Sequence, residues 1–119
     1  MALSHANYTQ LIDLGPLADG GTDSPSTSLI KTEHMQLLHL VLHRGQSLPQ
    51  HKLAGELSLQ CLAGRVRLST PGLELPLSAG QLIVLRGGEP HTLLAEQDSC
   101  LLLTLLLPPP HEQAGQESL

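Results

Sequence analysis

The chain has 119 residues, which is enough for one domain whose core folds without disulfides or structural metals. Its net charge is −5 and it contains no basic cluster, which argues against nucleic acid as a partner. No segment reaches the ~18 consecutive apolar residues of a membrane span, and the first residues lack the basic and apolar regions of a secretion signal. We therefore expect a cytoplasmic protein that binds neither nucleic acid nor membranes.

The core material of this chain is almost entirely aliphatic. Tyr8 is the only aromatic residue, and leucine takes the place of Phe and Trp in the apolar segments. A pocket in this protein should therefore have aliphatic walls, with little material for stacking on bases. Cys61 and Cys100 are far apart and each lies in an apolar run, so we expect two buried thiols rather than a disulfide or metal ligands.

In chain order, residues 1–27 are expected to form an N-terminal arm and loop, since 18–27 is rich in Gly, Asp, Ser and Thr. From residue 28 the chain changes to short apolar runs separated by Gly and Pro, a pattern typical of a β-sandwich or barrel. We expect the barrel over 28–108 and a disordered polar tail over 109–119. The predicted strands are 30–43, 56–62, 65–69, 73–77, 81–85, 91–95 and 100–107.

The last predicted strand, 100–107, shows no alternation and is apolar on both faces. Such a strand has to be covered twice, once by the barrel interior and once from outside. In a small domain a second subunit supplies the outer cover most easily, which predicts a homodimer. An N-terminal arm folded across the same face would serve equally well.

Two segments share one spacing, in which a glycine is followed by an extended stretch that ends at a histidine. They run from Gly45 to His51 and from Gly80 to His91. In order and spacing they resemble the two motifs of the cupin superfamily, in particular its small single-domain members. The resemblance implies an all-β fold, the cupin double-stranded β-helix, a jelly-roll-like barrel of two antiparallel sheets. It also implies a small-molecule pocket inside the barrel.

Some positions depart from the cupin pattern. In the first motif Leu53 stands where the family has its second histidine, and Leu57 stands where it has a glutamate. In the second motif Ala95 replaces an asparagine. The metal site implied by the resemblance is thereby reduced to His51 and His91.

Strand alternation predicts which of these side chains face the cavity, because residues two apart share a face. The apolar row that starts at Leu57 should face the interior, and the same parity carried backward turns His51 and Leu53 inward. On the later strand His91 and Ala95 share a face. The predicted ligand pocket is therefore lined by His51, Leu53, Leu57, His91 and Ala95.

Two histidines alone hold a divalent metal such as Fe, Mn, Ni or Zn weakly, because a catalytic centre typically keeps about three protein ligands. Candidates for a third ligand are Glu56, His39 and His43. Alternation turns Glu56 outward with Ser58, although a β-bulge nearby could rotate it inward. His39 and His43 lie opposite a more apolar row of leucines, which favours a surface or interface pair.

The leading hypothesis is a small cupin of unassigned activity that binds a small molecule, with or without one weakly held divalent metal at His51 and His91. The first alternative is a metal-dependent dioxygenase or isomerase whose third ligand is Glu56, His39 or His43. The second is a non-catalytic ligand-sensing or structural module. An imidazole with a pKa near ~6.5 also suits proton transfer without metal, so the sequence leaves open whether the protein is an enzyme.

Overall fold

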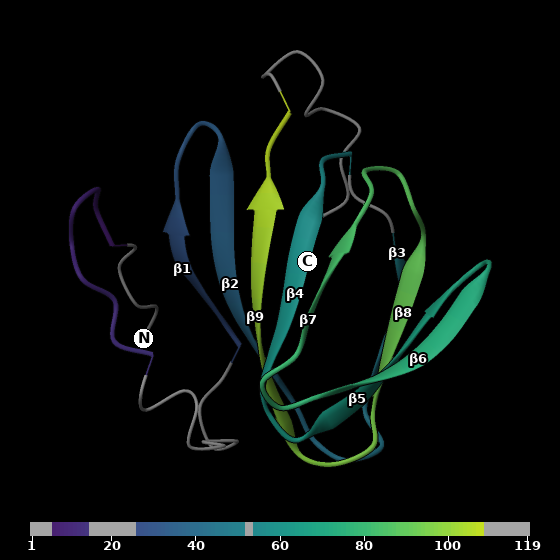
Figure 1. The fold of residues 1–119 in the computed structure, drawn as a ribbon. Coiled ribbons are helices and arrows are strands. Elements are labelled where there is room, and N and C mark those ends of the chain that lie inside the picture. The colour runs from purple at the N-terminus through teal and green to yellow at the C-terminus, as the bar shows by residue number, and fades with distance from the viewer. Residues whose placement is uncertain (1–5, 15–25, 52–53, 109–119) are drawn as a thin grey trace.

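The computed structural model describes residues 6–14, 26–51 and 54–108, without the side chains of 49–51. The described residues form strands and loops (Figure 1), and none of them forms a helix of the length and apolar character that crossing a membrane requires. The strands are β1 (Thr27–Lys31), β2 (Met35–Leu42), β3 (Ser47–His51), β4 (Leu57–Ala63), β5 (Arg65–Thr70), β6 (Leu73–Ser78), β7 (Leu82–Leu85), β8 (His91–Ala95) and β9 (Ser99–Leu106).

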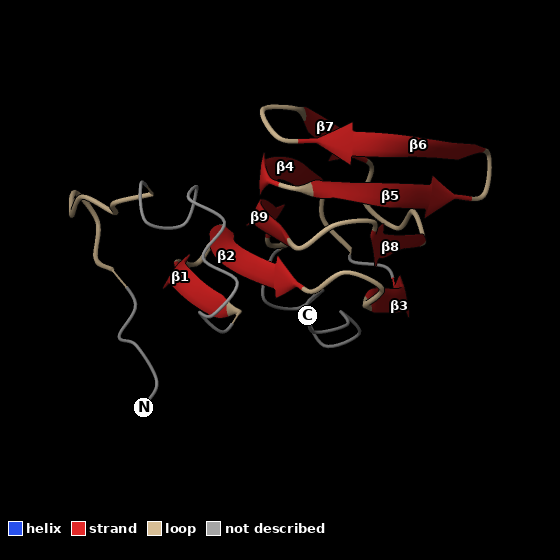
Figure 2. Ribbon diagram, turned by 90° about the horizontal axis from the view of Figure 1, so that it is seen from below, coloured by secondary structure: helices blue, strands red, loops and turns tan. Residues whose placement is uncertain are grey.

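The strands form two antiparallel sheets that face each other. The large sheet has the order β1-β2-β9-β4-β7 and the small sheet has the order β3-β8-β5-β6. In each sheet a late strand inserts between two early ones, β9 between β2 and β4 and β8 between β3 and β5. Figure 2 shows the two sheets from below, with β6 and β7 on one side of the barrel and β1 on the other. This topology confirms the predicted all-β, jelly-roll-like barrel.

The core between the sheets is built by alternate residues of the strands. On β4 the side chains of Leu57, Leu59 and Cys61 are buried, as the apolar row in the sequence predicts. On β2 the inward residues are the leucines opposite His39, which also join the core. The core cluster comprises Leu38, Leu40, Leu42, Leu57, Leu59, Cys61, Val66, Leu68, Leu77, Leu85, Leu93, Ala95, Leu101, Leu103 and Leu105.

One predicted strand is divided in the structure. The segment 30–43 contributes to both β1 and β2, and a turn at 32–34 separates them. The hydroxyl of Thr32 accepts hydrogen bonds from the backbone N–H groups of His34 (3.2 Å) and Met35 (3.1 Å). A threonine that bonds the backbone ahead of it competes with the extended conformation and favours a turn, which apolar periodicity alone does not reveal.

Strand β9 is apolar on both faces, but its two faces are covered to different extents. The inward residues Leu101, Leu103 and Leu105 belong to the core. On the outer face Cys100 is fully buried, whereas Leu106 at the other end of the strand is exposed. The outer face of β9, which we expected a second subunit or the N-terminal arm to cover, is therefore buried over only part of its length.

Both cysteines are buried and carry free thiols, as the sequence predicts. Burial raises the pKa of the Cys61 and Cys100 thiols, so both remain protonated at neutral pH. A protonated buried thiol behaves as a small apolar side chain, and both residues contribute to packing in this way.

Candidate functional site

His91 begins strand β8 directly after a tight turn. The backbone N–H of Glu89 donates to the carbonyl of Arg86 (3.3 Å), and Gly88 has φ +81°, which a glycine adopts without strain. The adjacent Gly87 lies so close to Ala54 that an added Cβ would overlap the Ala54 carbonyl oxygen. The loop after β7 therefore packs against the loop before β4, and this contact fixes where β8 starts.

The imidazole of His91 is held in the interior of the barrel. Its side chain is 1 % exposed and shares a face with the core residues Leu93 and Ala95. The ring Nδ1 lies 3.3 Å from the carbonyl oxygen of Glu89. Because a carbonyl only accepts, this bond places the proton of a neutral ring on Nδ1 and leaves a lone pair on Nε2, which is also buried.

The neighbouring strands place two polar residues beside His91. Ser69 on β5 is paired with Thr92 on β8, and Thr70 is the next residue along β5. On the other side, β3 pairs with β8 so that His51 is the backbone partner of His91, after a register irregularity between 48 and 51. The start of β8 thus lies between the end of β5 and the end of β3.

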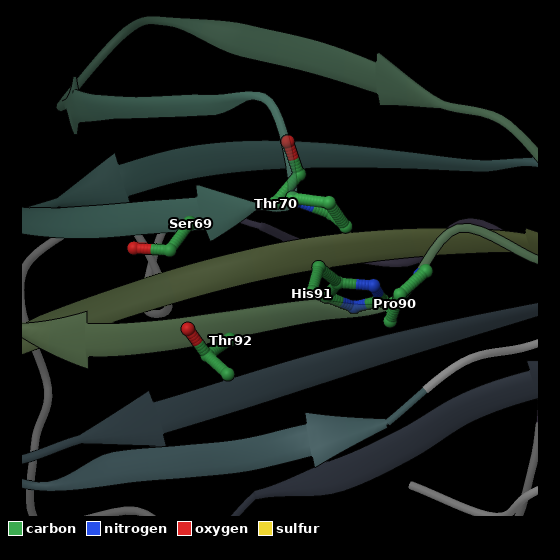
Figure 3. Close-up of a pocket in the computed structure, with 6 residues that line it drawn as sticks. Ser69, Thr70, Pro90, His91 and Thr92 are labelled. Atoms are coloured by element: carbon green, nitrogen blue, oxygen red, sulfur yellow. The ribbon is translucent and has the colours of Figure 1, made fainter.

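A cavity of about 230 Å³ opens at this end of the small sheet. Figure 3 shows its labelled side chains, which come from the end of β5 and the start of β8, with His91 among them. Hydroxyl groups, proline rings and the imidazole line the cavity, and none of these lining groups is a carboxylate, ammonium or guanidinium. The lining residues are Ser69, Thr70, Pro71, Pro90, His91 and Thr92.

The other predicted pocket residues are placed differently. Leu57 and Ala95 are buried within the core cluster, and Leu53 and the side chain of His51 lie outside the described part of the chain. The prediction that these residues line a ligand pocket with His91 stays a prediction. The hydroxyl residues Ser69, Thr70 and Thr92 were not predicted. The sequence pattern could have indicated Thr70, because it continues the alternation of Val66 and Leu68, whose side chains face the interior.

The three candidates for a third metal ligand lie elsewhere. Glu56 is exposed and lines a groove on the outer side of the large sheet, together with Ser58 as alternation predicts. His43 is exposed beyond the end of β2. His39 lies on the face of β2 opposite the core leucines, but it is 1 % exposed. The exposed surface position expected for His39 is therefore wrong, and the alternative of an interface position stays a prediction.

These placements decide how well the described residues fit a metal. Among them no three or more His, Cys, Asp or Glu side chains lie close enough together to hold a metal ion. A resident centre with about three protein ligands therefore does not fit the described residues.

The amino-acid sequence matches no protein-family model and no curated protein, but the fold matches known structures. A conserved protein of unknown function from Streptococcus pyogenes matches with a TM-score of 0.72 at 21% identity, over 91% of this chain and 96% of that chain. A cupin superfamily protein from Desulfitobacterium hafniense matches with a TM-score of 0.73 at 14% identity, over 91% of this chain and 99% of that chain.

A larger protein shares the barrel over part of its length. A salicylate 1,2-dioxygenase from Pseudoaminobacter salicylatoxidans matches with a TM-score of 0.63 at 16% identity, over 67% of this chain and 25% of that chain. At such identities the likeness concerns the fold and not the activity. Together with the nine-stranded topology of the described residues, these matches identify the chain as a small domain with the cupin fold.

Proposed function

We propose that this chain binds a small molecule bearing hydroxyl or carboxyl groups at the barrel end where His91 lies. The observation that carries the proposal is the burial of the His91 imidazole on the wall of a cavity of about 230 Å³. A cavity with apolar walls and a few convergent polar groups is the usual form of a small-molecule site. Thr70, at an inward position of β5, supplies a further hydroxyl, and Ser69 and Thr92 line the cavity from the other face of their strands.

The two protonation states of His91 select different ligand groups. A neutral ring with its proton on Nδ1 has its acceptor at Nε2, which is buried, so a ligand hydroxyl would bond it only after a local opening of the cavity wall. A protonated ring donates from both nitrogens and suits a carboxylate, with a charge-assisted bond. An imidazole can also act as a general acid or base toward the bound molecule.

The backbone pairing of His51 with His91 favours a role for both residues in the same site. A divalent metal held by such a pair alone would be bound weakly. We therefore expect the protein, purified untagged and without chelator, to contain well below one equivalent of Fe, Mn, Ni or Zn by elemental analysis. Full occupancy that is lost in His51→Ala and in His91→Ala would favour a metalloenzyme instead.

The binding proposal is tested with a panel of small acids and sugars, such as lactate, malate, salicylate, galacturonate and ribose. Each compound is scored both for a shift in melting temperature and for conversion to product. We expect at least one compound to stabilise the wild-type protein, and that shift to be lost in His91→Asn, which keeps an amide near the position of Nδ1 and removes Nε2. His43→Asn is the matched control, because His43 is exposed and distant in the fold. A shift that survives in His91→Asn would contradict the proposal, and product formation would separate an enzyme from a sensing module.

A further inference from the structure

The Nε2 atom of His91 is closed off from the cavity that borders this residue. The side chain is 1 % exposed and Nε2 itself is buried, although His91 belongs to the lining of the cavity. A molecule in the cavity therefore reaches Nε2 only when part of the wall moves. Two segments supply the wall, residues 69–71 at the end of β5 and residues 90–92 at the start of β8 (Figure 3).

The first of these segments belongs to the β5–β6 hairpin, whose inner part is fixed in the core. Val66 and Leu68 on β5 are fully buried, and Leu75, the partner of Leu68 on β6, packs against the core. Beyond this pair burial ends abruptly, since Ser69 and the next residue are only partly buried and residues 71–74 are exposed. Residues 69–74 form the hairpin end.

The hairpin end is joined to β8 at its first residue. Ser69 is paired with Thr92, which is the last pair of the β5–β8 ladder. The hydroxyl of Thr70 donates to the carbonyl of Leu73 (3.5 Å), a bond within the hairpin itself. An added Cβ at Gly72 would have nothing within 4 Å. Figures 1 and 2 both show the hairpin extending past β8, so its end projects beyond the strand that carries His91.

Open space also borders the hairpin along β6. This strand is an edge of the small sheet, and a cleft of about 360 Å³ lies between it and β7. The lining residues of the cleft are Leu75, Pro76, Leu77, Gln81, Leu82 and Ile83. Segments with few buried apolar contacts open locally at a lower free energy than the core does. The hairpin end, with a cavity on one side and a cleft on the other, has the properties of such a segment.

We infer that residues 69–74 form a lid, which opens about the pair of Leu68 and Leu75 and uncovers Nε2 of His91. Opening moves Thr70 away from the cavity, whereas the base of the hairpin stays in the core. Closure returns the Thr70 hydroxyl and the Pro71 ring to the wall around a ligand. The role of the ligand rests on the proposed function, but the opening does not, because it is a property of the free protein.

The opening is measured without ligand, by the reaction of diethyl pyrocarbonate with His91. This reagent carbethoxylates an unprotonated imidazole nitrogen, which in the neutral ring of His91 is Nε2. Peptide mass spectrometry follows the reaction, and the exposed His43 is the internal reference. We expect a His91 rate that low urea concentrations leave unchanged, because opening of the lid exposes little surface. A rate that rises with urea in parallel with global unfolding would overturn the inference.

A disulfide across the last pair of the β5–β8 ladder should hold the lid closed. Ser69→Cys/Thr92→Cys places two thiols at directly paired positions, where the Cβ atoms of neighbouring strands lie about 4.5–5.5 Å apart. We expect His91 to react at least ~10-fold more slowly in the oxidised variant than in the same variant after reduction, because the lid is then held closed. The native Cys61 and Cys100 are buried free thiols and take no part in this disulfide.

Arg67→Cys/Leu94→Cys is the matched control. These residues form the pair two positions earlier in the same ladder, so the pairing geometry is the same and the disulfide lies on the core side of the hinge. Each variant is compared with its own reduced form, because Arg67 also contacts Glu74 of the lid (3.4 Å). Oxidation should leave the His91 rate unchanged in the control. Equal slowing in both variants, or no slowing in Ser69→Cys/Thr92→Cys, would contradict a lid at 69–74.

Amide hydrogen exchange gives a second measurement, on the wild-type protein. The amides of the lid should exchange ~10-fold or more faster than those of 66–68 on the same strand, because the base of the hairpin is anchored in the core. Uniform protection along the hairpin would rule out a hinge at Leu68. If no small molecule of the panel binds, these results still stand. A compound that binds while the lid stays closed in both tests would keep the proposed function and remove the lid.

Discussion

Two histidines among the residues whose side chains the structure describes are buried, His91 and His39, and their surroundings differ. Each is 1 % exposed. His91 stands at the start of a strand, bonds the carbonyl of Glu89 through Nδ1 and borders a cavity with three hydroxyl residues. His39 stands in the middle of β2 between β1 and β9, and its buried Nε2 has no hydrogen-bond partner in the described part of the chain.

This difference shows that burial of a histidine is by itself a poor guide to function. The pKa of His39 is lowered because burial disfavours its charged form, and the ring is therefore a neutral polar group in an apolar layer. It borders none of the cavities described above. His91 is buried to the same degree, but its surroundings offer space for a ligand and groups to bind it. A neighbouring cavity with hydroxyl groups in its lining distinguishes the two residues.

The largest effect is expected from a change at the His91 end of the barrel, Gly87→Ala. The new methyl group would overlap the carbonyl oxygen of Ala54, so one of the two loops must move. Overpacking of this kind typically costs about 1–3 kcal/mol, and here it would also displace the start of β8. Urea unfolding measures the loss. Gly72→Ala is the control and should stay near wild type, because an added Cβ at Gly72 has nothing within 4 Å.

His39→Leu should stabilise the protein, which is the opposite of the usual result for a buried substitution. A buried polar atom without a hydrogen bond costs about 1–3 kcal/mol, and leucine fills a similar volume without that cost. The comparable change at the exposed His43 should alter the free energy of unfolding by less than ~0.5 kcal/mol. Destabilisation by His39→Leu would show that Nε2 has a partner in the native protein.

The pH dependence of stability should depend on His39. Its pKa is lowered in the folded state, so the unfolded chain binds the proton more readily. The stability associated with a neutral His39 is therefore complete above the unfolded pKa of about 6.5 and declines as the pH falls below it. Unfolding curves at a series of pH values should show a steeper decline for wild type than for His39→Leu. Parallel curves would contradict a lowered pKa.

The smallest change in stability is expected from Thr70→Val, which removes one hydroxyl beside His91 and keeps the shape of the side chain. Thr70 is only partly buried, so the free energy of unfolding should change by less than ~0.5 kcal/mol. If Thr70 bonds the ligand, the affinity for a compound that stabilises wild type should fall about fivefold, the equivalent of ~1 kcal/mol. Unchanged affinity would limit the site to His91 and its other neighbours.

The amino-acid sequence contained most of the information about the fold. Alternation in 57–61 and 91–95 identified inward residues correctly, and the glycine-to-histidine spacings indicated the cupin barrel. Alternation also placed His39 and Glu56 on the outer side of their sheet. Alternation could not indicate that His39 is buried, because burial on the outer face of a sheet depends on segments that are distant in the sequence. The division of 30–43 into two strands depended on side-chain hydrogen bonds of Thr32, which periodicity does not record.

The sequence by itself thus determined which residues form strands and which face of each strand is apolar, because these properties follow from local alternation and turn residues. Only the tertiary structure decided which polar residues meet. Thr70, His91 and His51 come from separate strands, and long-range pairing of β5, β8 and β3 brings the ends of these strands together. The tertiary structure also decided that, on the outer face of the large sheet, His39 is buried and Val84 is exposed. Burial at these positions depends on which segments lie next to them in space.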